Sequence, residues 1–274
     1  MKKVFEKEQF KERPSVLICG FGIVGRNIQS TFLWADLYDM DDSGVNFYVV
    51  NGERKSVSEH RKKYDFAFVC VPTPMKDGMG RCDISYVRDV LEKVDANIFV
   101  IKSTVPPKTT EYLREITGKR AIFSPEYQGN TQHANRSYNF VILGGEKSLT
   151  AKVAQLYQHA CTGELRIYFT DSKTAELCKY MENCFLAAKV VFCNEFFRIA
   201  RFIGINYEEL RELFVADPRV NPSHTFVYED YPYFDSKCFN KDLPALYAYM
   251  KEEGYEAEFI RMILDRNDFF RKNK

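Results

Sequence analysis

The sequence has no long apolar run, no excess of charge of either sign and no closely paired cysteines. No apolar run approaches the length that spans a bilayer, and the charged start, MKKVFEKEQFKERP, lacks the apolar segment of a secretory signal. Lysine and arginine total 39 against 38 acids, which gives no electrostatic reason to expect a nucleic-acid or membrane partner. None of the eight cysteines forms a C-x-x-C pair, so we expect no metal site. These absences predict a cytoplasmic protein whose cysteines are reduced thiols.

What the chain does contain is typical of a globular protein with a substantial core. Apolar residues make up 45% of the sequence and charged residues 28%. Its 274 residues are enough for one large domain or two of ordinary size. Four cysteines lie inside apolar runs, where a thiol acts as a small buried hydrophobe: Cys19, Cys70, Cys161 and Cys193.

Short apolar runs separated by longer mixed segments dominate the first part of the chain. Seven runs predict buried strands: residues 15–20, 46–51, 64–71, 97–104, 119–126, 139–145 and 164–171. Helical patterns lie between them, for example IVGRNIQSTFLWADL and SYVRDVLEKV. Strands that alternate with helices are typical of a parallel sheet covered on both faces. We therefore predict an α/β fold with a doubly wound parallel sheet.

The last hundred residues have a different character. From Asp171 to about Phe202 there is no proline or glycine, which predicts one unusually long helix. A second helix is predicted over 207–215, and further helices follow an irregular stretch that ends near Asn240. We therefore place a domain boundary near Asp171, with an all-helical domain over 171–274.

A glycine motif follows the first predicted strand. SVLICGFGIVGRNI carries G-x-G-x-x-G at Gly20, Gly22 and Gly25, between a strand and a helix. The first glycine permits a tight turn, the second lets a pyrophosphate approach the backbone, and the third lets the helix pack close to the sheet. In this context the motif predicts dinucleotide binding by a Rossmann-like domain over 1–170; the alternative is a turn that merely favours glycine.

The position expected to bind the ribose of the cofactor departs from the dinucleotide-binding fingerprint. The dinucleotide fingerprint expects an acid at the end of the second strand, whereas the run 46–51 ends in Asn51. An asparagine can hydrogen-bond a ribose hydroxyl. The neighbouring Arg54 and Lys55 suit a 2′-phosphate or simply form a solvated turn. At this point the sequence leaves NAD and NADP open.

Six further motifs follow the glycine loop in a fixed order. They are VCVPTP (69–74), KSTVPPKT (102–109), SPEY (124–127), TAELCKYMENCFLAAKVVFCNE (174–195), DPR (217–219) and CFNKD (238–242). Together they resemble the UDP-glucose/GDP-mannose dehydrogenase family, the nucleotide-sugar 6-dehydrogenases that make uronic acids. The likeness runs over about residues 15 to 272. It implies NAD as the cofactor and the oxidation of a nucleotide sugar, foremost UDP-glucose to UDP-glucuronate.

The family chemistry oxidises a primary alcohol to a carboxylate in two steps, with a covalent cysteine intermediate between them. A thiolate must therefore lie beside the sugar carbon. Cys238 matches the family's nucleophile. Asp242, four residues on, would lie near it in a helix, and by resemblance it helps to handle the water that hydrolyses the thioester.

Four other polar residues match catalytic positions of the family. By resemblance Glu126 assists the thioester hydrolysis, and Thr104 holds a water molecule or a cofactor group. Lys179 and Asn183, four residues apart, would project from one face of the long helix, where a cation and an amide donor stabilise an oxyanion. The alternative for each residue alone is an ordinary surface or turn position.

The resemblance also carries over cofactor, substrate and subunit contacts. The further residues assigned to NAD are Phe21, Ile23, Val24, Val71, Pro72, Thr73 and Lys241. Tyr127 and Arg219 are assigned to the substrate, the latter from a partner subunit. The long helix over 171–202 is expected to form a homodimer through an apolar outer face, made of Phe185, Val190, Phe192, Phe196 and Phe197.

Three departures from the family pattern concern the substrate. The family's cysteine usually follows a loop of the kind G-F-G-G-x-C, whereas residues 233–237 contain no glycine. Family members continue into a further nucleotide-binding domain, but this sequence ends at NDFFRKNK, where the connection to that domain is expected. Asn130 stands where a second glutamate is often found after the PE pair.

Two other functions are compatible with these motifs. A two-electron dehydrogenase of the 3-hydroxyacid or 6-phosphogluconate type shares the fold and a helix-borne lysine and asparagine, but it needs no thiol. A binding protein without turnover would explain the lost glycines. Dependence on Cys238 separates the first alternative from the main prediction, and reduction of NAD separates the second.

Overall fold

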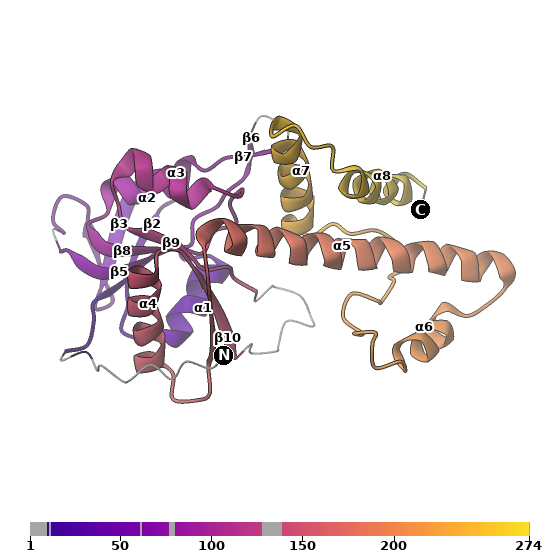
Figure 1. Cartoon of the computed structure of the whole chain (residues 1–274), viewed down its shortest axis with the longest axis horizontal. Helices are drawn as coiled ribbons and strands as arrows, with labels where there is room; N and C mark the ends of the chain where they lie inside the picture. Colours follow the sequence, from indigo (N-terminus) through magenta and orange to yellow (C-terminus); the bar gives the residue numbers. More distant parts are fainter. Residues whose placement is uncertain (1–9, 11, 61, 77–79, 128–138, 274) are drawn as a thin grey trace. The chain divides into compact units, whose positions relative to one another are not determined.

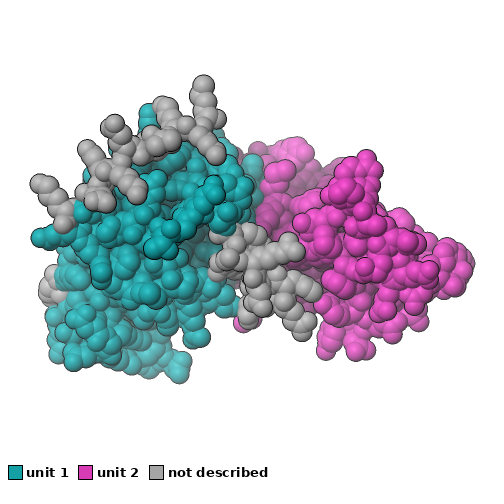
Figure 2. Space-filling view, turned by 90° about the horizontal axis from the view of Figure 1, so that it is seen from below, with its two compact units in different colours: residues 1–74, 83–179 teal, residues 75–82, 180–274 magenta. Residues whose placement is uncertain are grey.

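The computed structural model describes residues 10, 12–60, 62–76, 80–127 and 139–273 of the chain (Figure 1). The chain divides into two compact units (Figure 2). The first comprises residues 1–74 and 83–179, and the second comprises 75–82 and 180–274. The sequence-based boundary near residue 171 remains a prediction.

Among the described residues, nine strands of the first unit form one sheet in the order β11-β10-β9-β8-β5-β1-β2-β3-β4. Five neighbouring strands, β9-β8-β5-β1-β2, and the pair β10-β11 run parallel, whereas β9-β10, β2-β3 and β3-β4 are antiparallel. The bounds are β1 Val16–Cys19, β2 Asp36–Met40, β3 Asn46–Val50, β4 Glu53–Ser56, β5 Tyr64–Val69, β8 Ala96–Ile101, β9 Ala121–Phe123, β10 Phe140–Gly144 and β11 Arg166–Thr170.

Helices cover both faces of this sheet (Figure 1). One core lies under α1 (Ile23–Thr31) and α4 (Lys147–Ala160), and the other lies under α2 (Ser85–Lys93) and α3 (Thr109–Thr117). Successive strand residues point to opposite faces. Ile18 accordingly belongs to the first core, whereas Leu17 belongs to the second. The predicted doubly wound α/β fold is confirmed.

The region after α1 corrects the sequence analysis. The predicted helical stretch through Leu37 ends at Thr31, and β2 follows it as a parallel neighbour of β1. The run 46–51, predicted to be a parallel strand, contains β3, which is antiparallel to β2. The strand β2 was missed because its polar residues Asp36 and Asp39 interrupt the apolar pattern on which the strand predictions relied.

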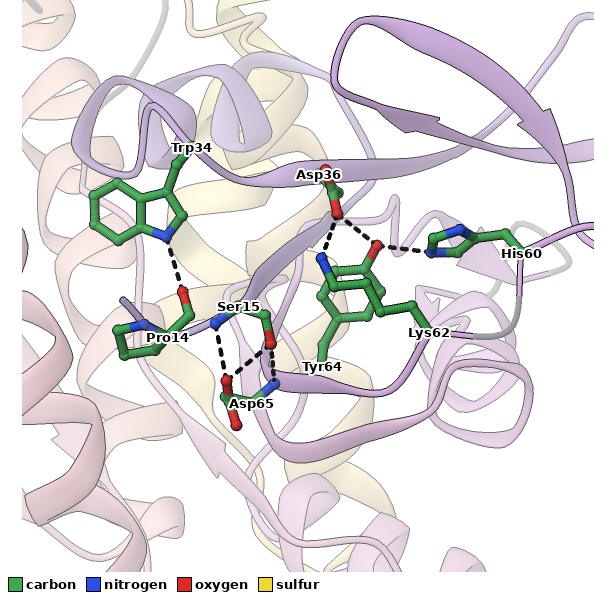
Figure 3. Close-up of polar contacts among 8 residues, drawn as sticks. All are labelled: Pro14, Ser15, Trp34, Asp36, His60, Lys62, Tyr64 and Asp65. Carbon is green, nitrogen blue, oxygen red and sulfur yellow. Dashed lines mark hydrogen bonds and ion pairs between the residues drawn. The ribbon is translucent and has the colours of Figure 1, made fainter. Parts of the chain in front are cut away.

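Polar contacts join the amino ends of β1, β2 and β5 (Figure 3). Buried Asp36 accepts hydrogen bonds from Lys62 Nζ at 2.9 Å and from the Tyr64 hydroxyl at 2.8 Å, and His60 Nε2 lies 2.9 Å from that hydroxyl. Burial, followed by the bond to Asp36, raises the pKa of Tyr64. Ligands of open α/β sheets bind at the opposite, carboxyl ends of the strands, where the glycine loop lies.

The second unit is mostly helical. It contains α6 (Tyr207–Val215), α7 (Lys237–Glu252), α8 (Glu258–Lys272) and most of α5 (Ser172–Ile203), with the short hairpin β6 (Met75–Lys76) and β7 (Arg81–Cys82). The predicted helices over 171–202 and 207–215 are confirmed. The hairpin belongs with α7, since Arg81 forms an ion pair with Glu252 at 2.5 Å.

The exposed side of α5 carries large apolar residues at helical spacing. Within the second unit they are Met181, Phe185, Phe192, Phe196, Ile199 and Ile203. Two residues expected on this face lie elsewhere, because Phe197 is buried and Val190 packs against the core of the unit. In the part of the chain that the structure describes, no helix is both long enough and apolar enough to cross a bilayer.

Candidate functional site

The glycine loop joins β1 to α1. Gly20 has a φ of +91°, and a Cβ on Gly25 would lie 2.0 Å from the Gly20 carbonyl oxygen, so α1 can pack this closely only with glycine there. Around Gly22, by contrast, nothing lies within 4 Å of the place where a Cβ would stand. The open space at the start of α1, where Ile23 and Val24 begin the helix, fits a dinucleotide pyrophosphate.

Asp39 is a candidate site residue that the sequence analysis did not single out. It lies near the carboxyl end of β2, and its Oδ2 accepts a hydrogen bond from the Phe21 backbone N–H at 2.9 Å. The dinucleotide fingerprint places the ribose-binding acid here, about 20 residues after the first glycine. That spacing from Gly20 was the signal in the sequence that pointed to Asp39.

Asn51 and Arg54 belong to the hairpin beside β2. Asn51 and Gly52, with φ of +51° and +83°, form the two-residue turn between β3 and β4. Arg54 forms an ion pair with Asp41, and its guanidinium lies 4.0 Å from the Phe47 ring centroid. Asn51 therefore does not end a parallel strand, so the assignment of Asn51 and Arg54 to the cofactor loses its original support.

The segments that follow β5 and β8 are tied together. The Thr73 hydroxyl donates to the Thr104 carbonyl at 2.8 Å, and the Ser103 hydroxyl donates to the Val71 carbonyl at 2.6 Å. These bonds bring Val71, Pro72 and Thr73, predicted to bind NAD, next to Thr104 at the carboxyl ends of neighbouring parallel strands.

Glu126 follows β9 and has a partner that the sequence analysis did not single out. Lys102 Nζ lies 3.4 Å from Glu126 Oε2 and donates to the Pro125 carbonyl at 3.1 Å. The Lys102 side chain is 3% exposed and the Glu126 side chain 14%. A buried ammonium requires such partners, so Lys102 fixes the backbone and the charge around Glu126.

Lys179 and Tyr127, both predicted to contact the substrate, lie together in the first unit. Lys179 Nζ lies 5.0 Å from the centroid of the Tyr127 ring, which is a cation–π distance. The Tyr127 hydroxyl is 3.6 Å from Cys178 Sγ. The amino-terminal part of α5 and the residue after Glu126 thus contact one another.

Asn183 and Asp242 meet in the second unit. The Asn183 Nδ2 donates to Asp242 Oδ2 at 2.6 Å, and both side chains are buried. Lys241 forms an ion pair with the other carboxylate oxygen of Asp242. Hydrogen bonds and a cation thus compensate the burial of this carboxylate.

Cys238 lies in the first turn of α7, one turn before Asp242. The helix starts at Lys237, after Ser236, whose Oγ accepts a hydrogen bond from the Phe239 N–H at 3.1 Å. All eight cysteines lie in the described part of the chain, and Cys238 is the one that is exposed. Burial raises the pKa of nearby Cys184 to about 12, which leaves Cys184 protonated at neutral pH.

Two residues singled out in the sequence remain to be placed. Arg219 is in the loop after α6, where it pairs with Asp217 at 2.5 Å and is highly exposed. Asn130 lies outside the described residues. Among the residues with described positions, no cluster of three or more His, Cys, Asp or Glu side chains is suited to a metal ion.

The candidate residues thus fall into two sets. Thr104, Glu126, Tyr127 and Lys179 belong to the first unit with the glycine loop, and Asn183, Cys238, Lys241 and Asp242 belong to the second.

Comparison with protein families gives two matches. Residues 48–161 match the NAD binding domain of the UDP-glucose/GDP-mannose dehydrogenase family, and residues 173–269 match the central domain of the same family.

Curated relatives of the chain include UDP-N-acetyl-D-mannosamine dehydrogenases and UDP-glucose 6-dehydrogenases. The chain is 31% identical over 231 residues to a UDP-N-acetyl-D-mannosamine dehydrogenase of Methanococcus vannielii, covering 80% of this chain and 52% of the relative. It is 30% identical to a UDP-glucose 6-dehydrogenase of Pseudomonas aeruginosa, covering 77% and 50%. The chain therefore spans about half the length of these curated relatives.

A solved structure supports the fold. The UDP-glucose dehydrogenase of Pyrobaculum islandicum superposes with a TM-score of 0.78 at 22% identity, covering 97% of this chain and 70% of that one. The likeness extends through both units of the chain.

Proposed function

Because the chain belongs to the UDP-glucose/GDP-mannose dehydrogenase family, we propose that it oxidises the primary alcohol of a nucleotide sugar to a carboxylate, with NAD as the oxidant. UDP-glucose, giving UDP-glucuronate, is the proposed substrate. The observation that carries the proposal is the hydrogen bond from Asn183 to buried Asp242, one helical turn after the exposed Cys238.

Cys238 carries the covalent part of the proposed reaction. Its sulfur adds to the aldehyde carbon left by the first oxidation, and the carbonyl oxygen takes a proton to give a thiohemiacetal. The second oxidation yields a thioester. Water then adds to the thioester carbon and the C–S bond breaks, which releases the carboxylate and restores the thiol. When bound, NAD would supply the hydride acceptor, and the two oxidations together would consume two NAD molecules, one for each electron pair.

The neighbouring polar groups have separate roles in this proposal. In the second unit, Asp242, oriented by Asn183 and Lys241, would handle the water that attacks the thioester, and Asn183 would stabilise the negative charge on the oxygen of the reacting carbon. The uncharged amide of Asn183 is suited to this role because it donates hydrogen bonds without losing a proton. In the first unit, the family resemblance assigns the handling of water to Glu126 and Thr104 and the stabilisation of that charge to Lys179.

The residues proposed here to hold NAD lie in the first unit, whereas Lys241, which the resemblance assigned to NAD, lies in the second unit in an ion pair with Asp242. We assign the pyrophosphate to the glycine loop and the start of α1, and the ribose hydroxyls to Asp39. A carboxylate at that position accepts hydrogen bonds from two hydroxyls and repels a 2′-phosphate. Asp39 therefore favours NAD over NADP, which the sequence analysis left open at Asn51.

A homodimer through the long helix is part of the proposal. The exposed apolar residues of α5 from Met181 to Ile203 form a stripe that a second copy of the helix would cover. In such a dimer Arg219 of one chain would be available to the substrate of the other.

NADH formation by the purified chain tests the function. The panel contains UDP-glucose, UDP-N-acetylmannosamine and GDP-mannose, each with NAD and with NADP. We expect two NADH per molecule of UDP-glucose, and a loss of activity of at least a thousandfold in Cys238→Ala. Cys161→Ala, which removes a half-buried thiol after α4, serves as the matched control and should remain active.

Two outcomes would contradict the proposal. One NADH per sugar, with full activity in Cys238→Ala, would indicate a two-electron dehydrogenase. Binding of NAD without reduction by any sugar would indicate a binding protein.

A further inference from the structure

We propose that Asn267 and Arg271 of α8 are positioning residues that clamp the glycine-free loop ahead of Cys238 and so fix where the first turn of α7 begins. The inference rests on the proposed function only for the role of Cys238. All the residues involved belong to the second unit.

Asn267 holds both polar groups of one backbone residue. Its Oδ1 accepts a hydrogen bond from the Phe234 N–H at 2.8 Å, and its Nδ2 donates to the Phe234 carbonyl at 3.1 Å. Asn267 is 2% exposed, so these bonds form away from competing water. A side-chain amide offers one donor and one acceptor group side by side, which suits this pairing; a carboxylate or an aliphatic side chain cannot reproduce it.

Arg271, one turn further along α8, holds the next residue. Its Nη2 lies 3.1 Å from Asp235 Oδ1 and 3.4 Å from the Phe234 carbonyl oxygen, and its guanidinium lies 5.2 Å from the Tyr233 ring centroid. Asp235 Oδ1 also accepts from Asn240 Nδ2 at 2.8 Å. A chain of contacts therefore leads from α8 through the loop into the first turns of α7.

The loop between this clamp and the thiol has little freedom left. Phe234 is buried against Phe239, with ring centroids 5.7 Å apart, and Ser236 caps α7. Where the family pattern relies on glycines, the shape of this loop is set by side chains of another helix. An ordered helix start lowers the pKa of a thiol in its first turn, because the free N–H groups favour the thiolate. The clamp thus acts on Cys238 through the start of α7.

The test is the rate at which iodoacetamide alkylates Cys238, followed by peptide mass spectrometry from pH 6 to pH 9 without sugar or NAD. We expect Asn267→Leu to slow alkylation at pH 7 by about tenfold and to move the pH profile upward by about one unit. Asn267→Asp keeps the acceptor for the Phe234 N–H but loses the donor to the Phe234 carbonyl. Its alkylation rate and pH profile should therefore lie between those of the wild type and those of Asn267→Leu. Asp268→Leu, which places a leucine at the exposed neighbouring position, is the control and should behave as the wild type.

Stability is measured in parallel by thermal unfolding. If Asn267→Leu does not fold, Asn267→Asp and Arg271→Gln, at a partly exposed position, carry the test, and both should slow alkylation. If the variants fold but their Cys238 is alkylated at the wild-type rate and with the wild-type pH profile, the clamp proposal is wrong.

The outcome of the alkylation test does not depend on whether the proposed function is correct. Alkylation needs no turnover, so a failure of every sugar to reduce NAD leaves the clamp measurable. Once a substrate is found, Asn267→Asp should lower kcat severalfold while KM changes less than twofold. If activity depends on Cys238 but is unchanged in the folded Asn267 and Arg271 variants, the clamp proposal is wrong while the proposed function stands.

Discussion

At the scale of single residues, Gly22 and Gly25 of the glycine loop have different surroundings. Substitution of Gly22 therefore tests cofactor binding, and substitution of Gly25 tests folding stability. A methyl group on Gly22 would enter open space, so Gly22→Ala should change the free energy of unfolding by less than about 1 kcal/mol while it weakens NAD binding at least tenfold. A methyl group on Gly25 would meet the Gly20 oxygen at 2.0 Å, so Gly25→Ala should cost several kcal/mol, on the order of an overpacked core.

Urea unfolding and an NADH fluorescence titration check both variants. Tight NADH binding by Gly22→Ala would contradict the assignment of this loop to the cofactor. Full stability of Gly25→Ala would contradict the close packing of α1 on the loop.

The same scale shows which site residues a sequence can reveal. Cys238 and Asp242 were singled out because CFNKD matches a motif of the family that the chain resembles, and their spacing of four would place them on one side of a helix. Asp39 was missed because it lies in a strand with few apolar residues. Lys102 was missed because nothing in a pattern shows that a lysine is buried; only the fold places its ammonium at Glu126 and Pro125.

At the scale of elements, Glu176 connects α5 to the start of α3. Its carboxylate accepts hydrogen bonds from the Lys108 N–H at 2.7 Å, the Thr110 N–H at 2.8 Å and the Thr110 hydroxyl at 2.6 Å. Burial nevertheless raises its pKa from the usual 4.5 to about 7. The group is poised to titrate near neutral pH without being part of the proposed chemistry.

This pKa predicts a pH dependence of stability. Between pH 4.5 and about 7 the native state holds the Glu176 proton more tightly than the unfolded chain does, so stability falls as pH rises. The expected loss is at most about 3 kcal/mol by pH 8. Glu176→Gln cannot titrate, so the difference between its free energy of unfolding and that of the wild type should narrow or reverse from pH 5 to pH 8.

Urea unfolding at the two pH values measures this difference. Glu115→Gln, at an exposed position on α3, is the control and should leave the pH dependence unchanged. A constant difference between wild type and Glu176→Gln over this range would show that Glu176 ionises with an ordinary pKa.

Elements with strong local signals were predictable, and those defined by their neighbours were not. The long α5 follows from the lack of proline and glycine over 171–202. The direction of β3 does not follow from its composition, because an apolar run of five residues fits a parallel or an antiparallel partner equally well. The Asn51-Gly52 pair was the available signal for the hairpin.

At the scale of the whole molecule, the proposed dimer can be tested without a substrate. Phe192 and Phe196 stack with ring centroids 4.7 Å apart and are 49% and 41% exposed. We expect sedimentation of the wild-type chain as a dimer, and of the double variant Phe192→Glu/Phe196→Glu as a monomer, because two charges would be buried at the interface.

Changing Arg201 of α5 and Glu208 of α6 to alanine, both at exposed positions, is the control for surface substitution in general and should leave the dimer intact. A wild-type chain that sediments as a monomer at micromolar concentration would contradict the proposed assembly.

The hairpin of β6 and β7 has a practical consequence for work on this chain. Because residues 75–82 belong to the same unit as α7, yet lie between two segments of the other unit, no single cut in the gene separates the two units. A fragment that starts at residue 180 would expose the surface of α7 around Pro244 and Glu252 that the hairpin contacts. Expressing the helical unit alone would require the hairpin to be rejoined to it by a linker.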